Sequence, residues 1–192
     1  MAVQYVNRKG DTYYLHEATT RTGKPKWFFS TKAEGRLAES LPPGYEISEN
    51  HNAQVFLRRE VPRLVTAGEI AVVERGVRKR AKLTYYFIEA RKDSIIVYLP
   101  NQNTEFLEGS VASRFGITDR AQLFTEMQRY LTYSPMMRFT LADAERRSFV
   151  VERWCFLGSL DDWFPLAGSG DLSAMVAKYV PHLGQDSYYE LT

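Results

Sequence analysis

The feature that most constrains the fold is a repeated alternation between two short strand-like runs and one helix-like run. It recurs four times, over residues 11–40, 45–80, 83–132 and 135–183. Strands joined by tight turns pair antiparallel, and the helix that follows each pair lies against a sheet. The sequence therefore predicts an α+β fold, with antiparallel sheets built from successive hairpin-then-helix units. The units share almost no residues, so they are not a sequence repeat.

Length and composition permit this fold without metals or disulfides. The chain has 192 residues, 44% of them hydrophobic and 14% aromatic. A chain of this size buries roughly 70% of the surface that it exposes when unfolded. Its one cysteine, Cys155, excludes an intramolecular disulfide and fits a reducing compartment. With no secretory signal and no apolar run of about 18 residues, we expect a cytoplasmic protein with no membrane partner.

Alternating apolar side chains predict four hairpins. In the first, Tyr13 and Leu15 alternate with Tyr14 and His16, and a turn-rich tip follows at residues 19–26. The other three hairpins are predicted at residues 45–48 with 54–58, 83–90 with 95–99, and 136–141 with 149–157.

Helix signals follow the hairpins. The clearest is Thr66 with Glu69, a capping box in which each side chain bonds the backbone N–H of the other residue. Apolar residues then recur at helical spacing at Ile70, Val73, Val77 and Ala81. Other helices are predicted at residues 33–41, 118–131 and from Asp171 to Pro181, and residues 188–191 are a candidate for a closing strand.

Residues 61–65 are the best linker candidate, and they divide the chain in two. Residues 1–60 form a hairpin-rich module that is basic and aromatic, and residues 66–192 form an α+β domain. The two parts either stay separate or pack together as one unit.

Charge is distributed unequally along the chain. Residues 1–100 carry 17 basic and 11 acidic residues, whereas residues 101–192 carry 8 and 12. Two explanations remain open: the oppositely charged halves dock on each other, or each half attracts a partner of its own.

The candidate binding surface is basic and aromatic, and belongs to the first hundred residues. Lysine and arginine neutralise phosphates, and exposed rings stack on bases or pack at protein interfaces. On a helix that begins at Thr66, four cations fall on the arc opposite the apolar face. The candidate residues are Arg21, Lys24, Lys26, Trp27, Tyr14, Arg58, Arg75, Arg78, Lys79 and Lys82.

We interpret the chain as a non-enzymatic binding protein whose partner is another protein or a second copy of itself. The alternative is a nucleic-acid-binding protein, which would use the helix at residues 66–82 and the hairpin tip at residues 19–27. Residues 111–131 add a weak likeness to a helix-turn-helix that would present Asp119, Arg120 and Gln122 to the major groove.

Signals for an enzyme are weaker. A hydrolase-type site would need Cys155 and His182 together with Asp161 or Asp162, but Cys155 lies in a strand-like run where a thiol packs as a small apolar group. The three histidines lack the spacing of metal ligands. The glycine-containing run at residues 167–171 lacks the lysine of a phosphate loop, and we expect Asp171 to cap a helix. We expect no catalytic residues, no metal and no cofactor.

Overall fold

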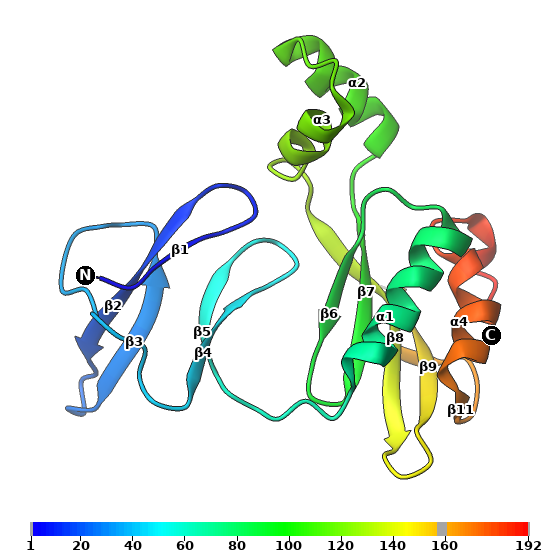
Figure 1. Ribbon diagram of the computed structural model, residues 1–192, viewed down its shortest axis with the longest axis horizontal. Coiled ribbons are helices and arrows are strands. Elements are labelled where there is room, and N and C mark those ends of the chain that lie inside the picture. Colours follow the sequence, from blue (N-terminus) through cyan, green and yellow to red (C-terminus); the bar gives the residue numbers. More distant parts are fainter. Residues whose placement is uncertain (1, 157–160, 192) are drawn as a thin grey trace. The chain divides into compact units, whose positions relative to one another are not determined.

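The computed structural model describes residues 2–156 and 161–191, and it has the expected α+β fold (Figure 1). Its contacts divide it into two compact units. Unit 1 contains the chain up to residue 61 and residues 102–132, and unit 2 contains residues 62–101 and the chain from residue 133 onward. Residues 102–132 are therefore grouped with the N-terminal segment, whereas the sequence-based division kept them within residues 66–192.

Unit 2 is built on an antiparallel sheet with the strand order β10-β9-β8-β7-β6, and β11 also pairs with β9. The third and fourth predicted hairpins are confirmed as β6–β7 and β8–β9. The strands are β6 (Phe87–Ala90), β7 (Ser94–Pro100), β8 (Tyr133–Asp143), β9 (Ser148–Phe156), β10 (Asp161–Pro165) and β11 (Gly170–Asp171).

The helices of unit 2 begin where the sequence places them. Helix α1 (Ala67–Gly76) has the predicted capping box and continues as a π-helical turn, Val77–Ala81. Helix α4 (Leu172–Tyr179) is capped by Asp171, whose Oδ1 accepts a hydrogen bond from the backbone N–H of Ala174 at 2.8 Å. Short 3₁₀ turns follow at Val180–His182 and Asp186–Tyr188.

The closing strand suggested for residues 188–191 is wrong. Tyr188 ends a 3₁₀ turn, its side chain is only 1% exposed, and its hydroxyl donates to the backbone carbonyl of Met136. Burial of this ring holds the segment against the core, where its backbone closes local turns and pairs with no strand.

The core of unit 2 lies between one face of the sheet and the two helices, which Figure 1 shows side by side. Alternate residues of β7 enter this core, and so does the apolar side of α1 that the spacing predicts. Fully buried members include Val73, Val77, Ile95, Val97, Met137, Phe139, Phe149, Val151, Val180 and Leu183.

Gly76 allows α1 to approach α4 closely. A Cβ built on Gly76 would overlap with Cγ1 of Val176 and would lie 3.9 Å from Cγ1 of Val180. Val176 is a branched side chain that is 3% exposed, so it cannot move aside freely. The absence of a side chain at Gly76 therefore sets the distance between the two helices.

Unit 1 contains a three-stranded sheet, a separate hairpin and a pair of helices. The sheet order β1-β2-β3 and the β4–β5 hairpin confirm the first two predicted hairpins. The elements are β1 (Gln4–Val6), β2 (Thr12–Thr19), β3 (Pro25–Ser30), β4 (Tyr45–Glu49), β5 (Val55–Arg59), α2 (Thr104–Phe115) and α3 (Arg120–Met127).

The helix predicted at residues 33–41 is wrong. This segment instead pairs with the sheet: Ala38 donates its N–H to Leu15 at 2.8 Å and accepts from Val3 at 2.9 Å, and Leu37 bridges to His16. Gly35 has a φ of 104°, which a helix does not allow. The bonds with neighbouring strands therefore replace the helical ones.

The helix predicted at residues 118–131 is present but shorter, as α3. Asp119 caps it, with Oδ2 accepting from the N–H of Gln122 at 2.7 Å. Helix α2 begins after the cap Asn103, a start that the sequence analysis missed.

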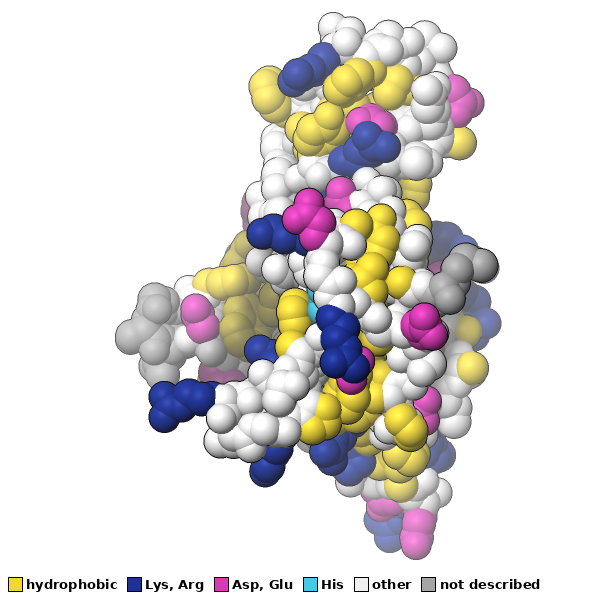
Figure 2. Space-filling view, turned by 90° about the vertical axis from the view of Figure 1, so that its left-hand side faces the viewer, with side chains coloured by type: hydrophobic (Ala, Val, Ile, Leu, Met, Phe, Trp, Pro, Cys, Tyr) yellow, Lys and Arg dark blue, Asp and Glu magenta, His cyan; other side chains and the backbone are white. Residues whose placement is uncertain are grey.

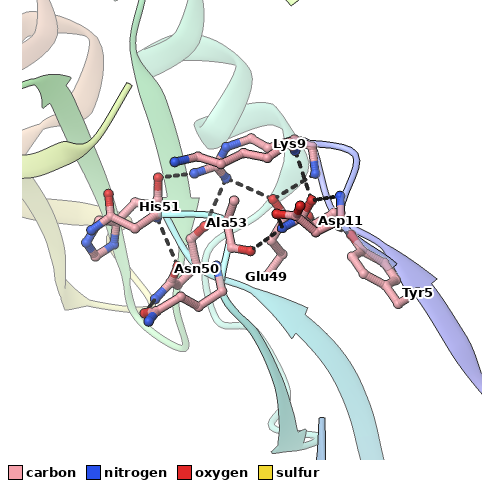
Figure 3. A network of polar contacts seen from close by, with 11 residues as sticks. Tyr5, Lys9, Asp11, Glu49, Asn50, His51 and Ala53 are labelled. Carbon is pink, nitrogen blue, oxygen red and sulfur yellow. Dashed lines mark hydrogen bonds and ion pairs between the residues drawn. The ribbon is translucent and has the colours of Figure 1, made fainter. Parts of the chain in front are cut away.

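A polar network ties the β1–β2 turn to the β4–β5 hairpin within unit 1 (Figure 3). Glu49 accepts from the hydroxyl of Tyr5 at 3.1 Å and pairs with Arg8 at 3.2 Å. Arg8 also donates to the carbonyls of Asn50 and His51. These contacts hold two turns together, and we interpret the network as structural.

We predict that Gly76→Ala destabilises the protein by about 1–3 kcal/mol, because the added methyl group overlaps with Val176. The matched control is Gly109→Ala in α2, where a Cβ meets nothing within 4 Å. That change should stabilise the protein by about 0.5–1 kcal/mol through helix propensity. Urea unfolding followed by circular dichroism measures both, and equal effects of the two changes would contradict the packing argument.

Candidate functional site

The ten predicted binding residues fall in both units, so neither unit holds the whole surface. Unit 2 contains Arg75, Arg78, Lys79 and Lys82, and unit 1 contains Tyr14, Arg21, Lys24, Lys26, Trp27 and Arg58.

The hairpin tip of unit 1 exposes its three cations, Arg21, Lys24 and Lys26. The two rings expected beside them, Trp27 and Tyr14, are half-buried, and in the sheet they lie opposite Glu17 and Ser30. This arrangement leaves cations without the open tryptophan surface that the sequence analysis expected.

The open ring of this hairpin is Phe28, which the sequence analysis did not select. Phe28 is 39% exposed and stacks on His16 with ring centroids 5.1 Å apart. The Lys26 Nζ lies 5.6 Å from its centroid. Trp27 and Phe28 are consecutive in the strand, so their side chains point to opposite faces of the sheet. The sequence pattern does not tell which of the two faces is buried.

Arg58 has an acidic partner. Its guanidinium donates two hydrogen bonds to Oε1 of Glu46, at 2.7 and 3.1 Å, across the β4–β5 hairpin. Because Glu46 matches its charge, Arg58 is a weak candidate for binding an anion.

The cations of unit 2 form the strongest candidate surface. Five lie within residues 75–82, and all five side chains are exposed. Within residues 2–156 and 161–191, none of them forms an ion pair at 4.0 Å or less. We name these residues the basic cluster: Arg75, Arg78, Lys79, Arg80 and Lys82.

The π-helical turn determines which of these cations share a side. At the 100° spacing of an α-helix, Arg80 lies about 140° from Arg75 and was therefore left out of the predicted set. Arg80 lies in the π-helical turn Val77–Ala81, whose angular spacing differs from that of an α-helix, and both Arg75 and Arg80 line one groove. Sequence periodicity gave no sign of this turn.

A groove between α1 and α4 collects three members of the basic cluster. It has a volume of about 250 Å³ and contains no acidic residue in its lining. Arg75, Lys79 and Arg80 supply charge, and Ser173 supplies a hydroxyl from α4. The remaining lining residues are Val72, Gly76 and Val176.

The first turn of α1 is fixed to the rest of unit 2 by Glu69. Its carboxylate accepts from the backbone N–H of Thr66 at 2.7 Å and pairs with Arg147 at 2.5 Å. Burial opposes the charged form of Glu69, but the hydrogen bonds from Arg147 and Thr66 outweigh burial and lower its pKa below the ordinary value. Helix α1 therefore presents the basic cluster from an anchored start.

The helix-turn-helix likeness at residues 111–131 corresponds to the end of α2, a left-handed turn at Gly116 and α3. Asp119 is occupied as the helix cap. The pair of helices exposes several rings, and Phe106 is the most open at 76%. Figure 2 shows hydrophobic side chains at the surface of this pair, at the top of the view.

The residues of the suggested hydrolase-type site lie on several elements. Cys155 is buried on β9, opposite Asp162 on β10. Nδ1 of His182 is hydrogen-bonded to Oγ of Ser187 at 2.8 Å. Asp161 lies on β10 opposite Phe156. Among the described residues, no three His, Cys, Asp or Glu side chains are grouped so as to hold a metal.

Comparison with known proteins yields no relative: no family model, no curated protein and no solved structure matches the chain. In the part of the chain that the structure describes, no helix has both the length and the apolar character needed to cross a bilayer. The candidate site therefore depends on its geometry and charge alone.

We predict that Arg147→Ala reduces stability by about 1 kcal/mol at neutral pH. The pKa of Glu69 is lower in the folded state than its ordinary value of 4.5. The ionised carboxylate therefore contributes its full stabilisation above pH 4.5, and this stabilisation is lost as the pH falls through the folded-state pKa. The variant should therefore lose less stability on acidification than the unmodified protein.

Urea unfolding at pH 7 and at pH 3 measures this difference. The matched control is Arg146→Ala, since that side chain is 86% exposed and its contact with Asp143 is 3.8 Å. An Arg147 variant with an unchanged acid dependence would contradict the role of the pair.

Proposed function

We propose that the protein is a non-enzymatic binding protein and that its basic cluster binds nucleic acid through phosphate groups. The observation that carries the proposal is that five exposed cations within eight residues have no acidic partner among the described residues. This choice reverses the order of partners that the sequence analysis favoured.

The physical basis is electrostatic. Each cation that contacts a phosphate releases condensed counterions from the nucleic acid, and this release drives binding at low salt. A cation that is already paired with a carboxylate contributes less binding free energy, because phosphate binding would first break the existing pair. The residues of the basic cluster have no such pair among the described residues, whereas Arg58 is paired with Glu46.

The hairpin tip of unit 1 is a secondary contact in this proposal. It offers Arg21, Lys24 and Lys26 to phosphates and the open ring of Phe28 to a base. Stacking of a base on an aromatic side chain contributes about 1–3 kcal/mol.

We predict that Arg78→Ala combined with Lys82→Ala weakens the binding of single-stranded oligonucleotides. Loss of two phosphate contacts should reduce the slope of log K against log salt by about 1.4. Fluorescence anisotropy between 50 and 200 mM salt measures affinity and slope together.

The control is Arg58→Ala, whose charge is already matched by Glu46, and it should leave the slope almost unchanged. If the unmodified protein binds no oligonucleotide at 50 mM salt, the proposal fails. If the protein binds an acidic protein and no nucleic acid, its partner is a protein and the nucleic-acid proposal is wrong.

A second candidate function is self-association through α2 and α3. Phe106, Phe115 and Phe124 are 76%, 48% and 42% exposed, and all three belong to this helical pair. Residues 102–132 carry four acidic and three basic residues, so two copies would meet without strong repulsion. A two-fold interface needs a self-complementary surface of this kind.

We predict that Phe106→Ser shifts the protein toward the monomer, because it removes the most exposed ring. Light scattering over a range of concentrations measures the change. Val6→Ser is the control, since Val6 is 61% exposed on β1 but lies outside the helical pair. An unmodified protein that is monomeric at every concentration would exclude this candidate.

A further inference from the structure

We propose that the groove between α1 and α4 binds a phosphate monoester, supplied by the 5′ end of a nucleic-acid strand. The inference rests on the proposed function and goes further, because it assigns the cations of the basic cluster to two tasks. Arg75, Lys79 and Arg80 hold the terminal group, and Arg78 and Lys82 contact phosphates along the chain.

The charge of the groove fits a terminal phosphate better than an internal one. A phosphate monoester carries a charge of about −1.5 to −2 at neutral pH, whereas an internal phosphodiester carries −1. Three cations line the groove and its lining contains no acid. A dianion relieves the mutual repulsion of three cations more completely than a monoanion does.

The donors of the groove also suit phosphate. Arg75 and Arg80 have planar guanidinium groups that can each donate two parallel hydrogen bonds to phosphate oxygens. Lys79 adds a point charge, and the Ser173 hydroxyl adds a donor from the opposite helix. Donors therefore come from both walls of the groove.

The groove has room for a phosphate group, since its volume is about 250 Å³. Val72 and Val176 give the groove apolar walls, and Gly76 contributes backbone to its lining. These walls cannot hydrogen-bond a base, so recognition would be independent of the terminal base.

Two acidic residues lie close in sequence to residues of the groove: Glu74 is next to Arg75, and Asp171 is near Ser173. Asp171 precedes Ser173 by two residues and is bonded as the cap of α4, outside the lining of the groove. Asp171→Asn keeps a good capping side chain and removes the negative charge. We expect this variant to bind the phosphorylated end more tightly than the unmodified protein.

The test compares one oligonucleotide with a 5′-phosphate and with a 5′-hydroxyl. We expect the unmodified protein to prefer the phosphorylated strand by about tenfold, the effect of roughly one charged hydrogen bond. Arg80→Ala and Ser173→Ala should each reduce this preference. The combined Arg78→Ala and Lys82→Ala variant should weaken both strands equally and keep the preference.

The outcomes separate the inference from the proposed function. Equal binding of the two strands overturns the groove inference while the proposed function stands, and binding of neither strand overturns both. A third arm titrates inorganic phosphate and follows competition with the phosphorylated strand. Phosphate binding by a protein that binds no strand would point to a small phosphorylated molecule and overturn the nucleic-acid source.

Discussion

The close approach of α1 to α4 at Gly76 is the constraint on which unit 2 depends. Because no side chain stands between the helix backbone and Val176, the two helices share one buried surface over the sheet. The same approach places Ser173 across from the cations of α1, and so creates the groove. One glycine therefore connects the stability of the unit with the shape of its candidate site.

The basic cluster is held in place by interactions that do not use its charges. The capping box and the pair between Glu69 and Arg147 fix the start of α1, and Val73 and Val77 bury its apolar side. The cations are thereby presented from a supported helix, with their side chains in water. Arg138 differs from these cations, because it is partly buried and pairs with Glu152 at 2.7 Å.

Local signals in the sequence predicted most helix starts, although the cap Asn103 of α2 was overlooked, and non-local pairing explains the error at residues 33–41. The capping residues predicted two helix starts correctly, with Thr66 and Glu69 at α1 and Asp171 at α4. These signals are local, because a cap acts within one turn of the helix. Residues 33–41 have the composition of a helix, but Leu15 and Val3 bond their backbone, and no local pattern reports such partners. Ser173 was missed for the same reason, since a helix crossing brings it to the groove, whereas Arg80 was left off the predicted arc because the π-helical turn changes the angular spacing.

The division of the chain has a consequence for how the protein can be assembled. Strands β7 and β8 are neighbours in the sheet of unit 2, yet the segment between them belongs to unit 1. Neither unit is one continuous stretch, and the polypeptide passes from one to the other three times. The β7–β8 ladder must close a loop that contains a helical pair, at an entropic cost that grows slowly with loop length. Cutting the gene at residue 61 would consequently leave residues 102–132 without the sequence they are grouped with, so the intact polypeptide is the natural unit of folding.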